Sequence, residues 1–283
     1  MKLRKASAAA AAAVALALTV TACGSGKKDD AAGGGSAGGG DKITIGIKVD
    51  QPGIGLKTPD GKFVGFDVDV AKYVAKELGY EEGDIVFKET KSADRETAIE
   101  RGDVKFIVAS YSINDKRLAK VDFAGPYLLA HQDILVRADD DSIKSPADLN
   151  NKKLCSVTGS TSAQNVKDKL APKAQLQEYG GYSECLTGLE NKVIDALTTD
   201  DSILAGYAAQ DAFKGKFKLA GFKMSNENYG IGLKKGDTEL KDKINKALEK
   251  MVQDKSWDKA VAAHFGPAGY QNEPAPKIGN IVQ

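Results

Sequence analysis

Arg117 is the residue whose type and setting point most clearly to chemistry. It closes the segment ASYSINDKR, in which a strand is predicted to end at Ser110 and Asn114 can cap a short helix. A guanidinium binds a carboxylate through two parallel hydrogen bonds. Ser110 and Ser112 place further hydroxyl and amide donors beside it. Arg117 is therefore a candidate ligand for an anion, and the alternative is a solvated charge on a helix surface.

A second group of polar residues follows two later strands. In VTGSTSAQN a strand leads through a turn of small residues into a helix, so Ser160, Thr161 and Ser162 can direct amides and hydroxyls at an anion. The simpler interpretation is that Ser160 or Ser162 only caps its helix. In ALTTDDSIL, Asp200 ends a strand, where its carboxylate can receive an ammonium group, and Asp201 is expected to cap the next helix. The alternative exchanges the roles of these two aspartates.

Three further side chains could contact the rest of a ligand. Lys48 and Gln51 lie in KVDQPGIG, directly after the first predicted strand, and Arg95 lies in ADRET. Two cations near one site suit a second carboxylate. Long charged side chains are usually exposed, so a solvated position is the alternative for both cations.

The start of the chain has the pattern of an export signal. Three positive charges precede an apolar run from Ala8 to Val20, which is shorter than the about 20 residues that span a bilayer. The four residues from Val20 to Cys23, VTAC, resemble a lipobox. We therefore expect residues 1–22 to be a signal peptide and Cys23 to carry a lipid such as palmitate, with residues 23–40 as a flexible tether on the outer face of the membrane. The alternative is an ordinary signal peptide with a chance cysteine.

Composition narrows the function of the expected mature chain. It keeps 261 of the 283 residues, enough for one large domain or two small ones. Losing three positive charges takes the formal net charge from +1 to −2, which argues against nucleic-acid binding. Cys155 and Cys185 are the cysteines that remain, in a chain facing an oxidising compartment, and we expect them to form a disulfide. Their spacing and the lack of partner ligands exclude a CxxC redox motif and a zinc site.

Strand and helix patterns alternate from residue 42 onward, in two α/β units that favour mostly parallel sheets flanked by helices. The helix FDVDVAKYVAKELG has Asp67 as its expected N-cap. The Pro-rich segment after residue 266 is expected to be irregular. The expected strands are 42–49, 84–90, 104–110, 132–138, 153–159, 174–179, 193–199, 217–221 and 229–237. The expected long helices are 66–79, 92–102, 162–170, 182–191, 201–210 and one or two over 239–266.

Several segments, in order, resemble one family. DGKFVGFDVDVAKYVAKELG, IVASYSINDKRLAKVDFAGPYLLA, VTGSTSAQNVK, VIDALTTDDSILAGYAA and YGIGLKKGD are similar to the polar amino-acid group (family 3) of bacterial extracellular solute-binding proteins, the receptors of ABC importers. The resemblance covers residues 43–265. Within it, IGIKVDQPGIGLKTPDG, GPYLLAHQDILVR and ALTTDD are most similar to the glutamate-binding lipoproteins of actinobacteria.

The resemblance implies a fold. This is the α/β, two-lobe periplasmic-binding-protein fold (type II), with each lobe a mostly parallel sheet flanked by helices and two crossing strands between the lobes. The crossings are expected near 134–140 and 228–234. Lobe one would then consist of residues 41–137 and, with the C-terminal tail, 230–283, and lobe two of residues 138–229.

The resemblance also implies a function, in which the lobes close on an amino acid and a permease receives it. Arg117 would bind the α-carboxylate and Asp200 the ammonium group. Many relatives stack an aromatic residue on the ligand after the first strand, and this chain has KVDQPGIG there. Its cations favour glutamate or aspartate, and the choice among Glu, Asp, Gln and Asn stays open. The expected partners are the amino acid, ABC permease subunits and the membrane, for a monomer without cofactor, metal or nucleic acid.

Catalysis is the main competing function, because some proteins with this fold are dehydratases. The chain has only two histidines, His131 and His264, and no GxSxG, HExxH or P-loop motif occurs outside the Gly-rich tether. His131 lies in an apolar strand, which is more typical of a structural imidazole than of a general base. We therefore expect no catalytic residue. A sensor or adhesin that binds without delivering its ligand is the third alternative.

Overall fold

The computed structural model describes residues 42–282. The predicted signal peptide (1–22), the lipidation site Cys23 and the tether (23–40) lie outside the described residues. Within the described part, no helix combines the length and the apolar composition needed to cross a membrane.

The order of elements follows the predicted alternation, with an additional small antiparallel sheet of β2, β3 and β4 that the sequence patterns do not predict. The strands are β1 (Ile43–Ile47), β2 (Asp50–Gln51), β3 (Gly55–Lys57), β4 (Phe63–Val64), β5 (Ile85–Glu89), β6 (Phe106–Val108), β7 (Asp122–Arg137), β8 (Lys153–Val157), β9 (Gln175–Tyr179), β10 (Ala196–Asp200), β11 (Phe217–Leu219) and β12 (Asn226–Leu233). The helices are α1 (Phe66–Glu77), α2 (Arg95–Glu100), α3 (Asp115–Leu118), α4 (Ser162–Lys169), α5 (Tyr182–Glu190), α6 (Asp201–Ala208), α7 (Thr238–Gln253) and α8 (Ser256–His264). Short 3-10 turns occupy Glu82–Asp84, Ser92–Asp94, Pro146–Leu149 and Gly266–Ala268.

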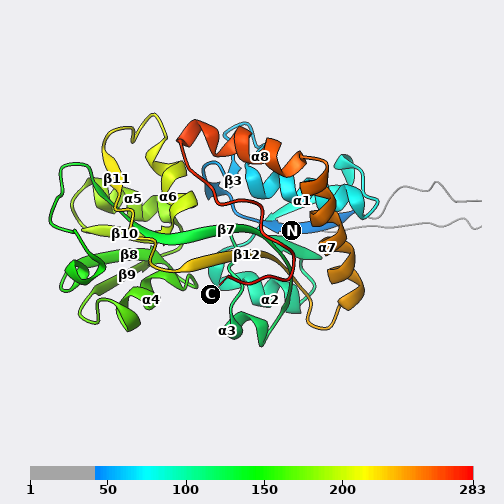
Figure 1. The fold of residues 1–283 in the computed structure, drawn as a ribbon, viewed down its shortest axis with the longest axis horizontal. Coiled ribbons are helices and arrows are strands. Elements are labelled where there is room, and N and C mark those ends of the chain that lie inside the picture. Colours follow the sequence, from blue (N-terminus) through cyan, green and yellow to red (C-terminus); the bar gives the residue numbers. More distant parts are fainter. Residues whose placement is uncertain (1–41, 283) are drawn as a thin grey trace, which may run out of the picture. The chain divides into compact units, whose positions relative to one another are not determined.

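Two groups of parallel strands form two lobes (Figure 1). One lobe contains β5, β1 and β6, and the other contains β10, β8 and β9, with parallel pairing inside each group. Between the groups, β12 and β7 pair antiparallel with each other and pass from one lobe to the other. Helices cover both faces: α1, α7 and α8 lie opposite α2 and α3 on the first lobe, and α5 and α6 lie opposite α4 on the second. The expected two-lobe fold with two crossing strands is confirmed.

Strand β7 is longer than expected, because it begins at residue 122 and not at 132. Gly125 and Pro126 are typical of a strand break, since proline has no amide to donate to the ladder. The strand continues because its register with β12 shifts at a bulge here, while Asn245 Oδ1 accepts a hydrogen bond from the Gly125 amide at 2.8 Å. After His131, β7 exchanges β12 for β10, starting with Gln132. The change of partner thus comes a few residues before the expected crossing at 134–140.

Helix α1 buries the predicted apolar face but begins differently. Its buried aliphatic residues are Val68, Val70, Ala71, Val74 and Ala75. The predicted N-cap is wrong, because Gly65 occupies that position with φ 128°, and a Cβ there would lie 2.2 Å from the Ile54 carbonyl oxygen. Asp67 is instead fully buried in the first turn. Its carboxylate accepts hydrogen bonds from the Ser110 amide at 2.7 Å and from the Tyr127 hydroxyl at 2.8 Å.

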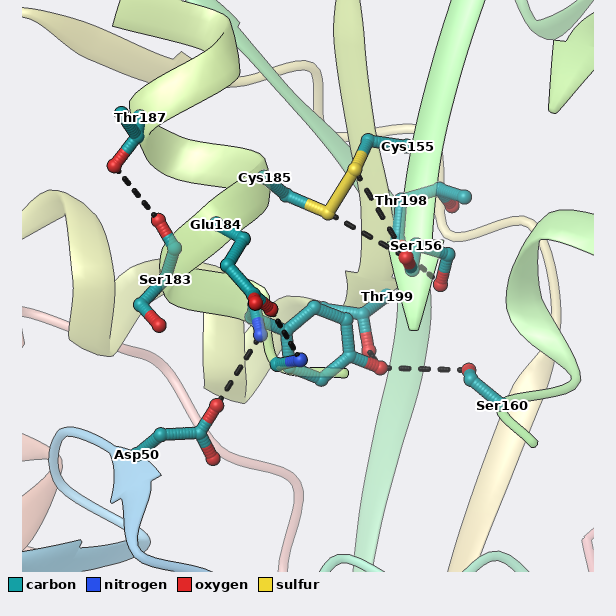
Figure 2. Close-up of a disulfide and its surroundings, with 12 residues drawn as sticks. Asp50, Cys155, Ser156, Ser160, Ser183, Glu184, Cys185, Thr187, Thr198 and Thr199 are labelled. Carbon is teal, nitrogen blue, oxygen red and sulfur yellow. Dashed lines mark hydrogen bonds between the residues drawn. A yellow bond between two sulfur atoms is a disulfide. The ribbon is translucent and has the colours of Figure 1, made fainter. Parts of the chain in front are cut away.

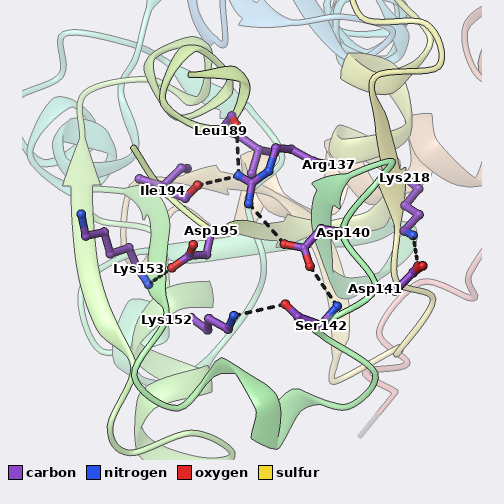
Figure 3. Close-up of polar contacts among 10 residues, drawn as sticks. All are labelled: Arg137, Asp140, Asp141, Ser142, Lys152, Lys153, Leu189, Ile194, Asp195 and Lys218. Carbon is purple, nitrogen blue, oxygen red and sulfur yellow. Dashed lines mark hydrogen bonds and ion pairs between the residues drawn. The ribbon is translucent and has the colours of Figure 1, made fainter. Parts of the chain in front are cut away.

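Two sets of contacts, a disulfide and the hydrogen bonds of Arg137, hold helix α5 against the rest of the second lobe. Cys185 on α5 and Cys155 on β8 form the predicted disulfide (Figure 2). Farther from the first lobe, Arg137 donates hydrogen bonds to the carbonyl oxygens of Leu189 at 3.2 Å and Ile194 at 2.9 Å, and pairs with Asp140 at 3.2 Å (Figure 3). These contacts fix α5, whose first residue reaches the space between the lobes.

The C-terminal segment after α8 is irregular, as its proline content predicts, but it is packed along the crossing strands (Figure 1). The Gly279 amide donates to the Gly125 carbonyl at 2.9 Å. Asn228 of β12 bonds the backbone of Val282 in both directions, at 2.9 and 3.0 Å. The tail therefore covers the outer side of the segment that connects the two lobes.

Candidate ligand-binding site

A small cavity of about 10 Å³ lies where both lobes meet. Seven of the nine predicted ligand-binding residues line it, namely Arg95, Ser110, Ser112, Arg117, Ser160, Thr161 and Asp200. The remaining lining residues are Ser92, Ser162, Tyr182, Thr199 and Ile203. Residues more than 100 positions apart in the chain thus meet at one site.

Arg117 is 6% exposed, so the alternative of a solvated surface charge is wrong. The predicted cap is present: Asn114 Oδ1 accepts a hydrogen bond from the Arg117 amide at 3.0 Å and starts α3. The guanidinium donates to the Ser112 carbonyl at 2.7 Å and, across the lobes, to the Gly159 carbonyl at 3.3 Å. Glu96 lies 3.8 Å away. These partners orient a buried, charged fork toward the cavity.

Asp200 ends β10 and is 5% exposed. Its Oδ2 accepts a hydrogen bond from the Tyr229 hydroxyl at 2.5 Å. Burial, and then the nearby Glu227, raise the pKa of Asp200 well above its ordinary value. An anion in this position is short of positive partners, which suits the binding of an ammonium group.

The cap assigned to Asp201 is wrong. The N-cap position of α6 belongs to Asp200, whose side chain makes no capping bond, and Asp201 is the first helical residue. Its Oδ1 accepts hydrogen bonds from the His131 amide at 3.0 Å and the Tyr270 hydroxyl at 2.8 Å, besides the amide that follows it. Asp201 therefore joins α6 to β7 and the C-terminal tail, and faces away from the cavity lining.

Arg95 is a second buried cation at the cavity, 2% exposed. Its guanidinium lies 4.0 Å from the ring centre of Tyr111 and donates to the backbone carbonyls of Ser92 at 3.3 Å and Ala109 at 3.1 Å. Among residues 42–282, no carboxylate forms an ion pair with it. Burial, and then Arg117, lower the pKa of Arg95 to about 10. The site therefore holds a cation whose charge has no close counter-ion in the described chain.

The serine residues at the site are fixed by local bonds. Ser110 has φ 44° and places its amide on Asp67, while Ser112 pairs with Tyr229 in an isolated bridge. In the second lobe, Thr161 occupies the N-cap of α4 without a side-chain cap. Ser160 Oγ accepts from the Ser162 amide at 3.3 Å, so it partly performs the capping role that we considered for it.

Lys48 and Gln51 lie elsewhere. Lys48 lines a larger cavity of about 240 Å³ between the lobes, together with Asp50 and the first residues of α5. Its Nζ donates to Ser92 Oγ at 2.8 Å, and burial followed by Arg95 lowers its pKa to about 7. Gln51 is 1% exposed and accepts from Ser110 Oγ at 3.0 Å, without lining either cavity. Lys48 therefore does not line the cavity that contains Arg117, and it contacts that cavity's lining through Ser92.

Sequence reasoning missed four of the lining residues, namely Ser92, Tyr182, Thr199 and Ile203. Thr199 Oγ1 donates to the Tyr182 hydroxyl at 2.6 Å, and that hydroxyl lies 3.4 Å from Ser160 Oγ (Figure 2). Thr199 precedes Asp200, so its position was available from the same strand end. Tyr182 carried a weaker signal, as an aromatic residue that starts a helix directly after two glycines.

Neither histidine lies at the cavity. His131 Nε2 contacts Glu273 at 3.0 Å, and His264 Nε2 contacts Asp69 at 2.7 Å. His131 is thus held structurally, as we expected. No group of three or more His, Cys, Asp and Glu side chains within the described residues could hold a metal ion.

Two α/β lobes that cross over through two strands and direct polar groups into a common site define the type II class of periplasmic binding proteins. Residues 43–267 match the family of bacterial extracellular solute-binding proteins, family 3. The chain belongs to this family, and it is a binding protein and not an enzyme.

Similar proteins and a solved structure agree with this assignment. The glutamate-binding protein GluB of Corynebacterium efficiens is 47% identical over 255 residues, covering 87% of this chain and 85% of the relative. The glutamine-binding protein GlnH of Bacillus subtilis is 40% identical over 77% of this chain and 79% of its own length. The structure of an ancestral arginine-binding protein bound to arginine has a TM-score of 0.74 at 36% identity, covering 80% of this chain and 98% of that one.

Proposed function

We propose that this protein captures L-glutamate outside the cytoplasm and delivers it to the permease of an ABC importer. A free amino acid brings a carboxylate and an ammonium group, and both need partners once water is excluded. Arg117 of lobe one binds the α-carboxylate, assisted by Ser110 and Ser112. Asp200 of lobe two receives the ammonium group. Ser160 and Thr161 add donors beside the carboxylate.

The observation that supports an acidic ligand is Arg95. This buried guanidinium lines the same cavity as Arg117 and forms no ion pair with a described carboxylate. A ligand that carries a distal carboxylate supplies the missing charge, whereas the guanidinium of arginine would meet a like charge. Lys48 and Gln51 act on the ligand indirectly. Lys48 forms a hydrogen bond with Ser92 and Gln51 forms one with Ser110, so both position residues that line the cavity.

Capture proceeds by closure about β7 and β12, with residues 41–137 and 230–283 as lobe one and 138–229 as lobe two. The Arg117 bond to the Gly159 carbonyl joins the lobes directly at the site. Only a ligand that contacts both lobes favours the closed form over the open one, so the permease can distinguish loaded from free receptor.

The receptor acts as a monomer anchored through a lipid on Cys23, with residues 23–40 as a tether. Cys23→Ser is expected to release the protein into the medium with unchanged affinity, because the tether precedes the binding fold. A variant that stays in the membrane fraction would contradict the lipid anchor.

Calorimetric titration tests which amino acid the protein binds. The panel comprises glutamate, aspartate, glutamine, asparagine and arginine, with recovery of unaltered ligand afterwards. Glutamate is expected to bind most tightly. Glutamine is the second candidate, because a relative at 40% identity is a glutamine-binding protein. Equal binding of glutamine and glutamate would overturn the role given to Arg95.

A further inference from the structure

Tyr229 is fully buried on β12, one of the two crossing strands (Figure 1). Its hydroxyl donates to Asp200 Oδ2 at 2.5 Å and lies 3.4 Å from Ser202 Oγ. Because Tyr229 already donates to Asp200, its oxygen is left to accept from Ser202. One phenol thus bonds the second lobe's only carboxylate in the cavity lining.

Tyr229 is the last residue of lobe two as bounded above, and its backbone and ring contact residues of the first lobe. Its backbone forms the isolated bridge with Ser112, next to the site. Its ring lies 6.2 Å, centre to centre, from the ring of Tyr127, whose hydroxyl bonds Asp67. Asp67 in turn fixes the Ser110 amide. The side chain therefore reaches Asp200 from a strand whose position is set by the lobe that carries Arg117.

We propose that Tyr229 is a positioning residue for ligand binding: its hydroxyl favours the ionised form of the Asp200 carboxylate and aims that carboxylate at the ammonium group of the ligand. This inference rests on the proposed function, in which Asp200 receives that ammonium group. A residue on a crossing strand is suited to the task, because closure brings Asp200 and the first lobe together about that same strand.

The surroundings of Asp200 explain why it needs such a donor. Charged and titratable groups face it from several elements: Glu227 and Tyr229 from β12, Asp201 from α6, Arg117 from α3, Tyr182 from α5 and Tyr270 from the C-terminal tail. Burial, Glu227 and Asp201 raise the pKa of Asp200, whereas the Tyr229 hydroxyl and Arg117 lower it. Without the hydroxyl, the pKa of Asp200 rises further.

Tyr229→Phe tests the proposal, because it removes the hydroxyl and keeps the ring. The dissociation constant for L-glutamate is measured for parent and variant from about pH 5 to pH 9, and their ratio cancels the ligand's own titration. An ionised Asp200 is needed for binding, so affinity is lost as pH falls through its pKa, and this loss begins at a higher pH in the variant. The ratio is expected to grow toward acid pH, reaching about tenfold or more.

Tyr207→Phe is the matched control, since it removes a buried hydroxyl that bonds the Asp50 carbonyl and not Asp200. The ratio of its dissociation constant for L-glutamate to that of the parent is expected to be independent of pH. A flat ratio for Tyr229→Phe would overturn the inference, whereas a parent that binds no amino acid would overturn the proposed function itself. If Tyr229→Phe does not fold, Ser202→Ala provides the same readout. Loss of the Ser202 hydroxyl makes the Tyr229 hydroxyl a weaker donor to Asp200. The ratio of dissociation constants, variant to parent, should therefore rise toward acid pH by a smaller factor. A flat ratio overturns the proposal.

Discussion

The two walls of the site differ in charge. The wall from the first lobe carries Arg95 and Arg117, with Lys48 behind Ser92, whereas the wall from the second lobe carries Asp200 among hydroxyl groups. Each wall alone can neutralise only one end of an amino acid. A ligand with both charges therefore gains its full set of partners only when the walls meet, and this difference links recognition to closure.

Asp200→Asn should produce the largest loss from the second wall. It removes the charge that pairs with the ammonium group, and breaking one side of a buried charge pair costs about 2–5 kcal/mol, or roughly 30-fold to several thousand-fold in affinity. Calorimetry with glutamate measures the loss. The matched variant Asp201→Asn should keep affinity near that of the parent, because its amide Oδ1 can accept the same hydrogen bonds from His131 and Tyr270. If Asp201→Asn were the variant that lost binding, the assignment would have to be exchanged.

Arg95→Met should show whether the first wall sets the selectivity between glutamate and glutamine. It removes a charged partner from a distal carboxylate but not from a distal amide, so glutamate should lose about tenfold more affinity than glutamine. Lys48→Met is the comparison, since the Lys48 ammonium reaches the lining only through Ser92, and it should change the ratio less. An unchanged ratio for Arg95→Met would remove the charge argument for glutamate.

Gly206→Ala should oppose closure of the two lobes. A Cβ on Gly206 of α6 would lie 2.0 Å from the Pro52 carbonyl oxygen of the first lobe. The same change favours a helix by up to about 1 kcal/mol, so the second lobe itself should not be destabilised. Affinity should fall by about tenfold, for a closure penalty near 1.4 kcal/mol, and small-angle scattering should show less compaction with ligand. Gly188→Ala on α5 is the control, because its Cβ meets Ile194 at an ordinary 3.5 Å. Parent-like affinity in Gly206→Ala would contradict closure at this contact.

Asp67→Asn should have the smallest effect on ligand affinity, and its main effect should be a change in the pH dependence of stability. Burial raises the pKa of Asp67 from 3.8 to about 7. The folded state thus holds this proton more tightly than the unfolded state, so its contribution to stability is present below pH 3.8 and is lost as the pH rises toward about 7. Urea unfolding of parent and variant should show the parent's relative stability falling across this window, by at most about 1.4 kcal/mol per pH unit. A constant difference would show that Asp67 is ionised throughout.

The chain's patterns predicted most of the fold, because its strands and helices have regular apolar spacing and local caps such as Asn114. They failed where a local signal was outweighed by distant partners. The strand was expected to begin at residue 132, yet β7 begins at residue 122 and continues through Pro126 with a bulge against β12. Asp67 looked like a cap, yet its partners Ser110 and Tyr127 are 43 and 60 residues away.

The same limit applies to the site. Arg117 follows the end of β6 and Asp200 ends β10, so the alternation that predicts the sheets also brings them to the cleft. Tyr229 gave no such signal, because it begins the expected strand 229–237 and its partner Asp200 is 29 residues away. Lys48 was expected at the ligand, and only the structure shows Ser92 between it and the cavity.

The most direct test of the central claim uses Arg117→Met with two ligands, L-glutamate and γ-aminobutyrate, which is glutamate without its α-carboxylate. In the parent, glutamate should bind far more tightly. In Arg117→Met, glutamate should lose roughly 30-fold to several thousand-fold in affinity while γ-aminobutyrate loses little, so the two affinities converge. Lys116→Met, an exposed neighbour, should leave both unchanged. If the parent's preference for glutamate survives in Arg117→Met, Arg117 does not bind the α-carboxylate and the division of charge between the two walls is wrong.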